Sequence, residues 1–408
     1  MFEGKTTGCD DNETDHLPLR ERAQTVSQTE PDVPGPKGQH SSWCRRTTIN
    51  KGQDGQGQEE CMMSDDEYDT DLELEEREDS QDSAGQRCYL EVCKKLQVVP
   101  SSYFLHNMQT TSVFMMHYSL GPQGTKALAV SLVTNTSILR LNLRDNWMEG
   151  MGGAAIAEML KENCYITEVD LSDNMLEDYG AKAIASMLQK NATLVSLNLS
   201  GNHVTDRSTE HLGQALITNT TLQHLDLSHN ALGECTGQNL RDCLSENMGL
   251  RSLSLAWNSI RGKGAVMLAD GLRENIFLRT VDLSFNGFAK EGAVAMGLAL
   301  KENDVLEELN LSNNRIPPEG AIHLALGLKV NKRIKSLNIS RNPVQNAGCY
   351  GILQSVRDNP DSAMESLDFS DIAVNQDFEE LYAAVKEKYP ALTVNHGGTF
   401  DTFRKVKA

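Results

Sequence analysis

The sequence lacks the features that mark a membrane protein, a disulfide-stabilised domain or a zinc module. No run of 18 apolar residues occurs among its 408 residues, and the first residues contain no apolar segment like that of a signal peptide. The nine cysteines are scattered, odd in number and never spaced as CxxC, which disfavours disulfides and zinc. We therefore expect no membrane partner and a reducing compartment, by default the cytoplasm, with the nucleus or cytoskeleton as alternatives.

The motifs of common enzyme classes are also missing. No P-loop, GxSxG, HExxH or dinucleotide-binding sequence is present, and the ten histidines are dispersed. Asp170, Asp226 and Asp282 share one position of the repeat described below but fall in alternate repeats, which places them roughly 10 Å apart, too far for a metal pair. The sequence thus predicts no enzyme activity, metal site, cofactor or small-molecule substrate.

The net charge of −19 is concentrated in the first part of the chain. Residues 1–85 contain 22 acidic and 8 basic residues, and residues 65–79 alone contain ten acids. Such composition, without any hydrophobic period, is typical of a disordered acidic tail, and it disfavours nucleic acid as a partner. Ser64, Thr70 and Ser80 adjoin the acids and are candidate sites for an acidophilic kinase, although a solubilising tail is the simpler interpretation.

The rest of the chain is dominated by a repeat of 28 residues. Two columns of asparagine recur with this step: Asn146, Asn174, Asn202, Asn230, Asn258, Asn286, Asn314 and Asn342, and Asn107, Asn135, Asn163, Asn191, Asn219, Asn247, Asn275, Asn303, Asn331 and Asn359. Three and five residues before each asparagine of the first column stands an aliphatic residue, a period typical of a short half-buried strand. Ten and fourteen residues after it, pairs such as Ile156 and Leu160 follow helical spacing.

The recurring polar and small residues have expected structural roles. The first asparagine is expected to bond the turn after the strand and to form a ladder with its equivalents. The second is expected to close the helix in a left-handed conformation. Glycine follows six residues after the first asparagine, as at Gly152 and Gly292, where the missing Cβ is expected to allow close packing of the helix. Ser208 and Thr236 break this rule, which indicates a kink or partner site, or more simply a shifted helix start.

Stacked strand–helix units predict an α/β solenoid. Adjacent strands lie about 4.8 Å apart and packed helices roughly 8–10 Å apart. The stack should therefore bend into a right-handed horseshoe with parallel strands on the concave face and helices on the convex face. We expect a tail over 1–85, a helical N-terminal cap over 86–109, repeats over 110–374, and a C-terminal cap and tail over 375–408. Eight repeats are regular and one at each end is degenerate, with a register slip of two residues near Asn359.

The unit LxxLxLxxN followed by GAxAxAxxLxxN resembles the ribonuclease-inhibitor-like class of leucine-rich repeats. This resemblance covers about residues 110–374 and implies the horseshoe fold. It implies no single activity, because repeats of this class serve many partners. The segments Tyr89–Lys95 and Val99–Phe104 resemble a smaller group of leucine-rich-repeat proteins.

The candidate binding site comes from the residue before each first-column asparagine, which is expected to face outward on the concave side. In three successive repeats it is His229, Trp257 and Phe285, a contiguous aromatic patch of the kind that anchors protein interfaces. Trp147 and His203, one residue after their asparagines, are expected to extend the patch. The alternative is that the rings lie flat against one another and only cover the edge of the sheet.

These observations predict a non-enzymatic scaffold that binds a protein partner on its concave face. The resemblance to the GTPase-activating protein for Ran suggests a regulator of a small GTPase as the alternative, with Arg140 and Arg144 as candidate residues. That family carries its acidic tail at the opposite end of the chain. Repeats similar to those of tropomodulin-like proteins suggest an actin-end binder, which we favour less because residues 1–85 contain no convincing amphipathic actin-binding helix.

Overall fold

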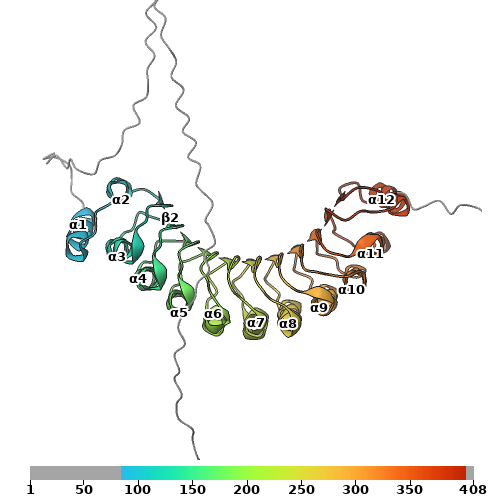
Figure 1. The fold of residues 1–408 in the computed structure, drawn as a ribbon, viewed down its shortest axis with the longest axis horizontal. Helices are drawn as coiled ribbons and strands as arrows, with labels where there is room; N and C mark the ends of the chain where they lie inside the picture. Colours follow the sequence, from blue (N-terminus) through green and yellow to red (C-terminus); the bar gives the residue numbers. More distant parts are fainter. Residues whose placement is uncertain (1–83, 401–408) are drawn as a thin grey trace, which may run out of the picture. The chain divides into compact units, whose positions relative to one another are not determined.

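Residues 84–400, which a computed structural model describes, form one curved stack of strands and helices (Figure 1). Eleven short strands in this part of the chain make a single parallel sheet in sequence order. The strands follow the inner side of the curve and the helices its outer side, which confirms the predicted α/β solenoid.

The strands are β1 (Ser112–Phe114), β2 (Arg140–Asn142), β3 (Glu168–Asp170), β4 (Ser196–Asn198), β5 (His224–Asp226), β6 (Ser252–Ser254), β7 (Thr280–Asp282), β8 (Glu308–Asn310), β9 (Ser336–Asn338), β10 (Ser366–Phe369) and β11 (Thr393–His396). The helices are α1 (Ala84–Leu96), α2 (Ser102–Asn107), α3 (Gly121–Leu132), α4 (Glu149–Glu162), α5 (Glu177–Leu188), α6 (Asp206–Thr218), α7 (Glu234–Glu246), α8 (Gly262–Glu274), α9 (Ala289–Glu302), α10 (Pro318–Leu328), α11 (Gln345–Asp358) and α12 (Gln376–Lys388).

Neighbouring strands pair in a constant register. From β1 to β9 each residue pairs with the residue 28 positions further along, as Leu141 does with Val169. Between β9 and β10 the step is 30, because Ser336 pairs with Ser366, which agrees with the predicted slip of two. Equivalent residues of successive repeats therefore stand beside one another across the sheet.

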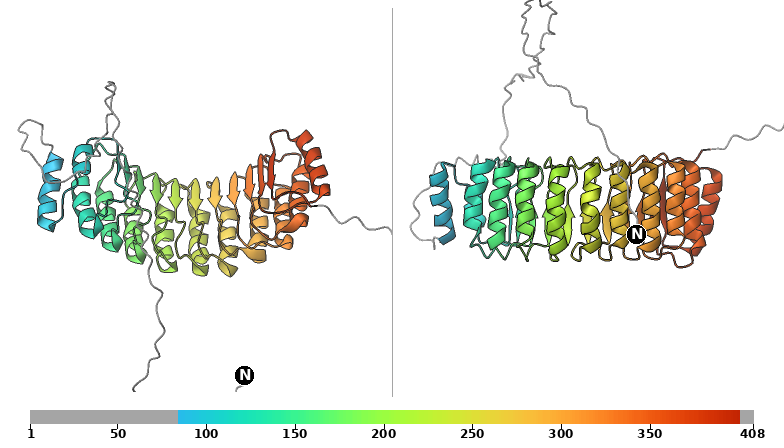
Figure 2. Two further views of the ribbon diagram at one scale, coloured as in Figure 1. Left: turned by 45° about the horizontal axis from the view of Figure 1, so that its top comes forward. Right: turned by 90° about the horizontal axis from the view of Figure 1, so that it is seen from below.

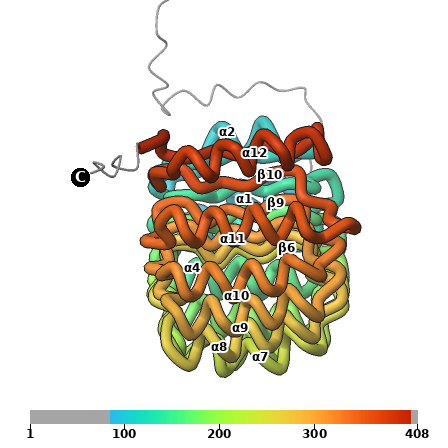
Figure 3. The backbone as a smooth tube through the Cα atoms, turned by 90° about the vertical axis from the view of Figure 1, so that its right-hand side faces the viewer, coloured from blue at the N-terminus to red at the C-terminus, as the bar shows by residue number. Residues whose placement is uncertain are grey.

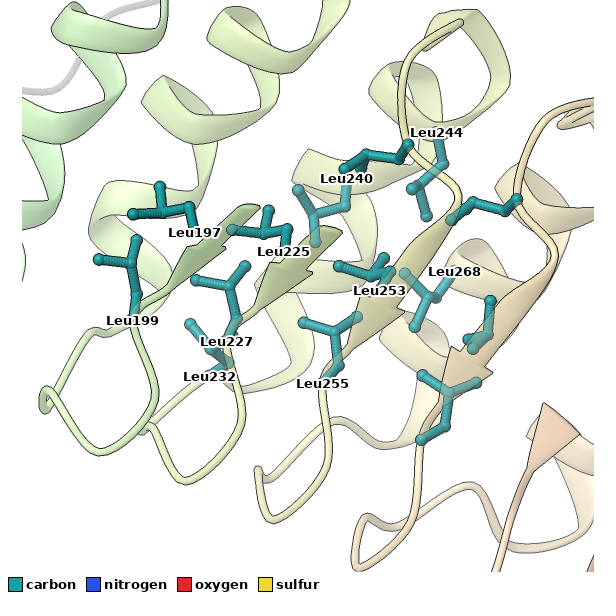
Figure 4. Close-up of a cluster of buried hydrophobic side chains, with 14 of the residues drawn as sticks. Leu197, Leu199, Leu225, Leu227, Leu232, Leu240, Leu244, Leu253, Leu255 and Leu268 are labelled. Carbon is teal, nitrogen blue, oxygen red and sulfur yellow. The ribbon is translucent and has the colours of Figure 1, made fainter. Parts of the chain in front are cut away.

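Aliphatic side chains fill the space between the sheet and the helices. Leu225 and Leu227 project from the strand side toward Leu240 and Leu244 of α7 (Figure 4), and none of the four is more than 2% exposed. Each unit is covered on both sides only by its neighbours, so the core is continuous along the stack and no unit is stable alone.

The first asparagine column joins each repeat to both of its neighbours. Nδ2 of Asn174 donates to the carbonyls of Leu171 and Ser172 in its own turn and to that of Leu143 in the preceding repeat, at 2.8–3.0 Å. Its backbone N–H donates to Oδ1 of Asn202 in the next repeat, at 3.0 Å. Equivalent bonds recur along the column, so the expected ladder of asparagines is confirmed.

The second asparagine column adopts a different conformation from the one predicted. Asn163 follows α4 with φ −75° and ψ 122°, which is extended rather than left-handed. Its side chain performs the closing role instead: Nδ2 donates to the carbonyls of Leu132 and Asn135 in the preceding repeat, and Oδ1 accepts from Tyr165 and Ile166, all at 2.9–3.0 Å. The left-handed prediction was therefore wrong: the side-chain amide, and not a left-handed backbone, closes the helix at Asn163.

The glycine column lies where neighbouring helices approach closely. A Cβ at Gly292 of α9 would stand 3.0 Å from the Cβ of Ala265 on α8, and one at Gly152 of α4 would stand 3.3 Å from the Cβ of Thr125 on α3. Both distances are shorter than ordinary carbon–carbon contacts. Glycine therefore sets the spacing of the helices on the outer side of the stack.

Ser208 and Thr236, which replace this glycine, are compensated by acids on the preceding helix. Oδ1 of Asp178 accepts from Ser208 Oγ at 3.0 Å, and its two oxygens accept from the N–H and hydroxyl of Thr205 at 2.9 and 2.7 Å. Asp206 accepts in the same way from the hydroxyl of Thr236. In both repeats the helix starts one residue later than in α4 or α5 relative to the asparagine. Because α8 and α10 start equally late and keep the glycine, the shifted start does not by itself account for the substitution.

Both ends of the stack are closed by atypical elements. α1 begins at Ala84, two residues before the boundary expected for the N-terminal cap, and the ring of Tyr89 packs edge-on against Phe104 of α2 with centroids 4.8 Å apart. At the other end α12 and β11 cover the last repeat. The acidic tail predicted over residues 1–85 falls, except for its last two residues, outside the described residues.

The asparagine ladder can be tested with two adjacent asparagines. Asn314→Asp replaces an Nδ2 that donates to the carbonyls of Leu283 and Ser312 with an oxygen that repels them. We expect the free energy of unfolding to fall by about 3 kcal/mol in urea titrations followed by circular dichroism. Asn313→Asp, whose side chain is partly exposed, should change it by less than about 0.5 kcal/mol. Equal effects would show that the ladder does not stabilise the stack.

The acid that caps α6 should make stability depend on pH. Burial raises the pKa of Asp178, but hydrogen bonds from Thr205 and Ser208 outweigh it, and the net pKa lies below its usual value. A lowered carboxyl pKa stabilises the fold above the unfolded-state pKa of about 3.9, and this contribution is lost as the pH falls. We expect Asp178→Asn to cost about 1–2 kcal/mol at neutral pH. The difference from wild type should shrink between about pH 5 and pH 2; a constant difference would contradict the assignment.

Candidate functional site

The residue before each first-column asparagine occupies a left-handed turn at the edge of the sheet. The φ angles lie between 51° and 67° for Asp145, Asp173, Gly201, His229, Trp257, Phe285, Asn313 and Arg341. Each of these residues comes three positions after the last residue of its strand. The predicted patch therefore lies at the edge where the strands end, and not on the strands themselves, because the chain turns before reaching it.

Three of these residues form a continuous stack of rings, here called the aromatic stack (His229, Trp257 and Phe285). The centroids of Trp257 and Phe285 are 3.6 Å apart with an interplanar angle of 11°, and those of His229 and Trp257 are 5.2 Å apart with an angle of 14°. The backbone N–H of each residue donates to a carbonyl of the next repeat at 2.9–3.0 Å. The spacing of the repeats therefore sets the spacing of the rings.

The aromatic stack covers the faces of its rings but leaves their edges open. Trp257 has a ring on each face and is still 48% exposed; His229 is exposed and Phe285 is half-buried. Within residues 84–400 no hydrogen bond engages the indole N–H of Trp257 or the ring nitrogens of His229. The rings lie flat against one another, as the alternative interpretation held, and still present apolar edges and polar ring atoms to solvent.

Trp147 and His203 do not join the aromatic stack. Both adopt left-handed conformations, with φ of 55° and 57°, and both are exposed, Trp147 by 61%. No ring contact between either of them and the stack occurs among the described residues. Trp147 lies three repeats before His229, and His203 is offset to the other side of its asparagine.

The same edge becomes ionic on both sides of the aromatic stack. His117 and Asp145 lie 2.7 Å apart, Arg144 Nε and Asp173 Oδ2 lie 2.9 Å apart, and an equivalent pair of 2.9 Å joins Arg341 to Asp371 beyond the stack. Gly201 separates Asp173 from His229, and a Cβ there would collide with the Asp173 carboxylate. The edge therefore changes from charged to aromatic and back within nine repeats.

The candidate residues of the GTPase-regulator alternative are engaged within the fold. Arg144 pairs with Asp173, and Nε of Arg140 donates to Ser112 Oγ at 3.0 Å. Both side chains are exposed. Neither is a free guanidinium in this structure.

The inner face beside the aromatic stack is lined by small and acidic side chains. Ser228, Ala256 and Ser284 precede the three rings and are at most 7% exposed. Oδ1 of Asp226 and of Asp282 accepts from the backbone N–H two residues further on, at 2.8 Å. These carboxylates therefore order the turns that carry the rings. In the part of the chain that the structure describes, no group of three or more His, Cys, Asp or Glu side chains could hold a metal ion.

The opposite edge of the sheet, where the strands begin, carries a row of alternating charge. Glu307 accepts from Lys335 Nζ at 2.7 Å and from Arg279 Nη1 at 3.2 Å. The hydrogen bond from Lys335, reinforced by the positive charges of Lys335 and Arg279, lowers the pKa of Glu307. The guanidinium of Arg251 lies 5.3 Å from the ring centroid of Phe277. The charged side chains described at this edge are engaged with one another in ion pairs.

No activated nucleophile stands out among the buried thiols. Burial raises the pKa of Cys243 and of Cys349 to about 12, so both remain protonated and act as core residues.

No helix within residues 84–400 is long and apolar enough to cross a bilayer. The candidate phosphorylation sites Ser64, Thr70 and Ser80 lie outside the described residues.

Sequence reasoning missed a second exposed apolar surface, on the outer side of the stack. Leu298 on α9, and Ile322, Leu326 and Val330 on or next to α10, are each 47–58% exposed. The available signal was the outward position of each helix, which is polar in most repeats and aliphatic in α9 and α10, as it is at Val130 of α3.

Comparison with known proteins agrees with the repeat architecture. The family model described as Leucine Rich repeat matches seven segments: 134–157, 162–185, 190–208, 218–234, 246–269, 274–297 and 302–325. A human protein, leucine-rich repeat-containing protein 74B, is 47% identical over 58 residues, which is 14% of this chain and 15% of that protein. The match thus spans only a small part of either protein.

Two solved structures match this chain at low sequence identity and with TM-scores below 0.5. A TLR13–ssRNA13 complex matches with a TM-score of 0.48 and 18% identity, over 76% of this chain and 39% of that one. An internalin from Listeria monocytogenes matches with a TM-score of 0.38 and 15% identity, over 77% of this chain and 89% of that one. The 28-residue units, the parallel sheet and the family match identify this chain as a leucine-rich-repeat protein that resembles leucine-rich repeat-containing protein 74B.

Proposed function

We propose that this protein is a non-enzymatic interaction scaffold that binds a protein partner at the strand-end edge of its concave face. The observation that carries the proposal is the aromatic stack, in which three rings from successive repeats are ordered, contiguous and open to solvent. Contiguous exposed aromatic surface on a folded domain is typical of interaction sites. The partner itself is a protein of unknown identity.

The backbone conformation strengthens this interpretation. Left-handed positions favour glycine, asparagine and aspartate, and are less favourable for bulky side chains. The repeats outside the stack follow this preference at Asp145, Asp173, Gly201 and Asn313, with Arg341 as the exception. Trp257 and Phe285 do not, although φ is 53° and 54° there. Residues that break a local preference are often retained for function rather than for folding.

The chemistry of the stack suits a partner with both apolar and polar groups. Because the faces of Trp257 are covered, a partner meets the edges of the rings, the indole N–H and the imidazole nitrogens. An aliphatic side chain can pack on the edges while a carbonyl or carboxylate accepts from the N–H. The stacked rings are already ordered, so binding loses little side-chain entropy. Tryptophan is one of the residues most enriched among interface hot spots, which cluster near the centre of the contact.

Two exposed tryptophans allow a matched test. Trp257→Asn removes the centre of the stack while keeping a residue that tolerates the left-handed backbone, and Trp147→Asn makes the same change outside the stack. Proteins captured by the wild-type chain are identified by mass spectrometry, and the affinity of the purified partner is measured by calorimetry. We expect Trp257→Asn to weaken binding roughly 30-fold, as loss of about 2 kcal/mol implies.

The control should bind like the wild type. If Trp147→Asn weakens the partner as much as Trp257→Asn does, the site is not the aromatic stack. If Trp257→Asn captures the same partner with unchanged affinity, the rings only cover the edge of the sheet. Circular dichroism of each variant verifies that the repeats remain folded.

A further inference from the structure

Two neighbouring helices on the outer side of the stack carry the same pattern of outward side chains. The pattern is an acid, two aliphatic residues and a lysine at positions i, i+3, i+7 and i+10, which fall on one face of a helix. The two stripes are Glu291, Val294, Leu298 and Lys301 from α9, and Glu319, Ile322, Leu326 and Lys329 from α10. We call this surface the α9–α10 surface.

The other repeats do not have this pattern. At the same four positions α6 has Arg207, Glu210, Gln214 and Ile217, and α7 has Cys235, Gln238, Asp242 and Ser245. The flanking helices have one aliphatic or aromatic residue each, Val266 on α8 and Tyr350 on α11, both partly buried. The apolar surface is therefore centred on α9 and α10 and fades on either side.

The two stripes form one surface because glycines let their helices pack closely, as they also do between α7 and α8. A Cβ at Gly297 of α9 would collide with the backbone carbonyl of His323 in α10, and one at Gly327 would collide with the carbonyl of Gly297. The two helices thus approach almost backbone to backbone. They lie side by side and parallel in the right-hand view of Figure 2 and again in Figure 3.

The charges that bound the α9–α10 surface are not used within the chain. Glu291, Glu319, Lys301 and Lys329 are exposed, and within residues 84–400 no ion pair involves any of them. Acids at helix N-termini and bases at C-termini are favoured by the helix dipole, which explains the ends of the stripes. It does not explain why the middle of each stripe is aliphatic, with Leu298, Ile322 and Leu326 about half exposed.

We propose that the α9–α10 surface is a dimer interface that pairs with the same surface of a second copy of this chain. A two-fold axis through its centre turns each stripe end for end. The acidic ends of one copy then face the lysines of the other, while the aliphatic middles overlap. Such self-complementarity is what an isologous interface requires. A different partner would have to carry acidic and basic groups in the reverse order to pair with this surface. A second copy, turned by the two-fold axis, already presents them in that order.

The geometry predicts a weak dimer that leaves the aromatic stack free. Two curved outer surfaces touch over only a few helices, so the buried area falls at the low end for specific interfaces. A dissociation constant on the order of 10 µM is therefore expected. Strands and helices lie on opposite sides of the curve, so the aromatic stack of each copy remains accessible in the dimer.

The first experiment is sedimentation velocity of the full chain from about 1 to 100 µM, a range that spans the expected constant. The wild type should shift from monomer to dimer across this range. The double variant Leu298→Ser/Leu326→Ser should stay monomeric, while Met151→Ser, which changes a residue of α4 that is 64% exposed, should dimerise like the wild type. A monomeric wild type at every concentration, or a dimer indifferent to the double variant, would overturn the proposal.

A charge-reversal experiment tests the orientation. The acidic variant Lys301→Glu/Lys329→Glu and the basic variant Glu291→Lys/Glu319→Lys should each be monomeric, because each brings like charges together across the axis. Their equimolar mixture should form a heterodimer, which also shows that both variants are folded. A mixture that stays monomeric excludes the two-fold arrangement. Trp257→Asn should dimerise like the wild type. Failure of the dimer proposal can therefore be distinguished from failure of the proposed binding site at the aromatic stack.

Discussion

The fixed register between repeats is the constraint on which the rest of the structure depends. Asn174 shows how the column works: its side chain bonds carbonyls of its own turn and of the preceding turn, and its N–H donates to the side chain of Asn202 in the following one. Such bonds prevent one repeat from sliding relative to its neighbours. Equivalent positions then stand in straight rows along the stack. A feature of the sequence that recurs every 28 residues becomes a continuous surface, and one that changes between repeats becomes a local patch on that surface.

The two sides of the stack use this register at different scales. On the inner side the rows follow the strand spacing of about 4.8 Å, which is close to the separation of stacked rings, so aromatic residues in adjacent repeats must pack on each other. On the outer side packed helices lie roughly 8–10 Å apart, so the outward side chains of adjacent repeats do not stack on one another. Aromatic residues thus make an ordered stack inside, whereas aliphatic residues outside make an uncovered surface.

The periodic features could be predicted from the sequence, and the local geometry of single residues could not. The strands, the helices and the ladder follow from leucine spacing and from Asn174 and its equivalents. The second column failed because the cross-repeat bonds of Asn163, which hold its backbone extended, are invisible in one unit. The repeat pattern places Trp257 next to its asparagine but does not show that the chain has already turned there, at the edge where the strand ends. The sequence shows that Trp147 follows its asparagine, but it does not show where the turn directs the ring relative to the aromatic stack.

The repeats between the ionic and aromatic parts of the edge show how local substitutions are absorbed. Where Ser208 and Thr236 replace glycine, the neighbouring helix supplies Asp178 and Asp206 to bond their hydroxyls, and the register of β4, β5 and β6 stays at 28. The aromatic stack begins in the next turns, at His229 and Trp257. A shift of even part of a strand spacing there would separate the rings, since their contact distances depend on the backbone bonds between repeats. The bonds to Ser208 and Thr236 therefore accommodate the loss of glycine without changing the register on which the aromatic stack depends.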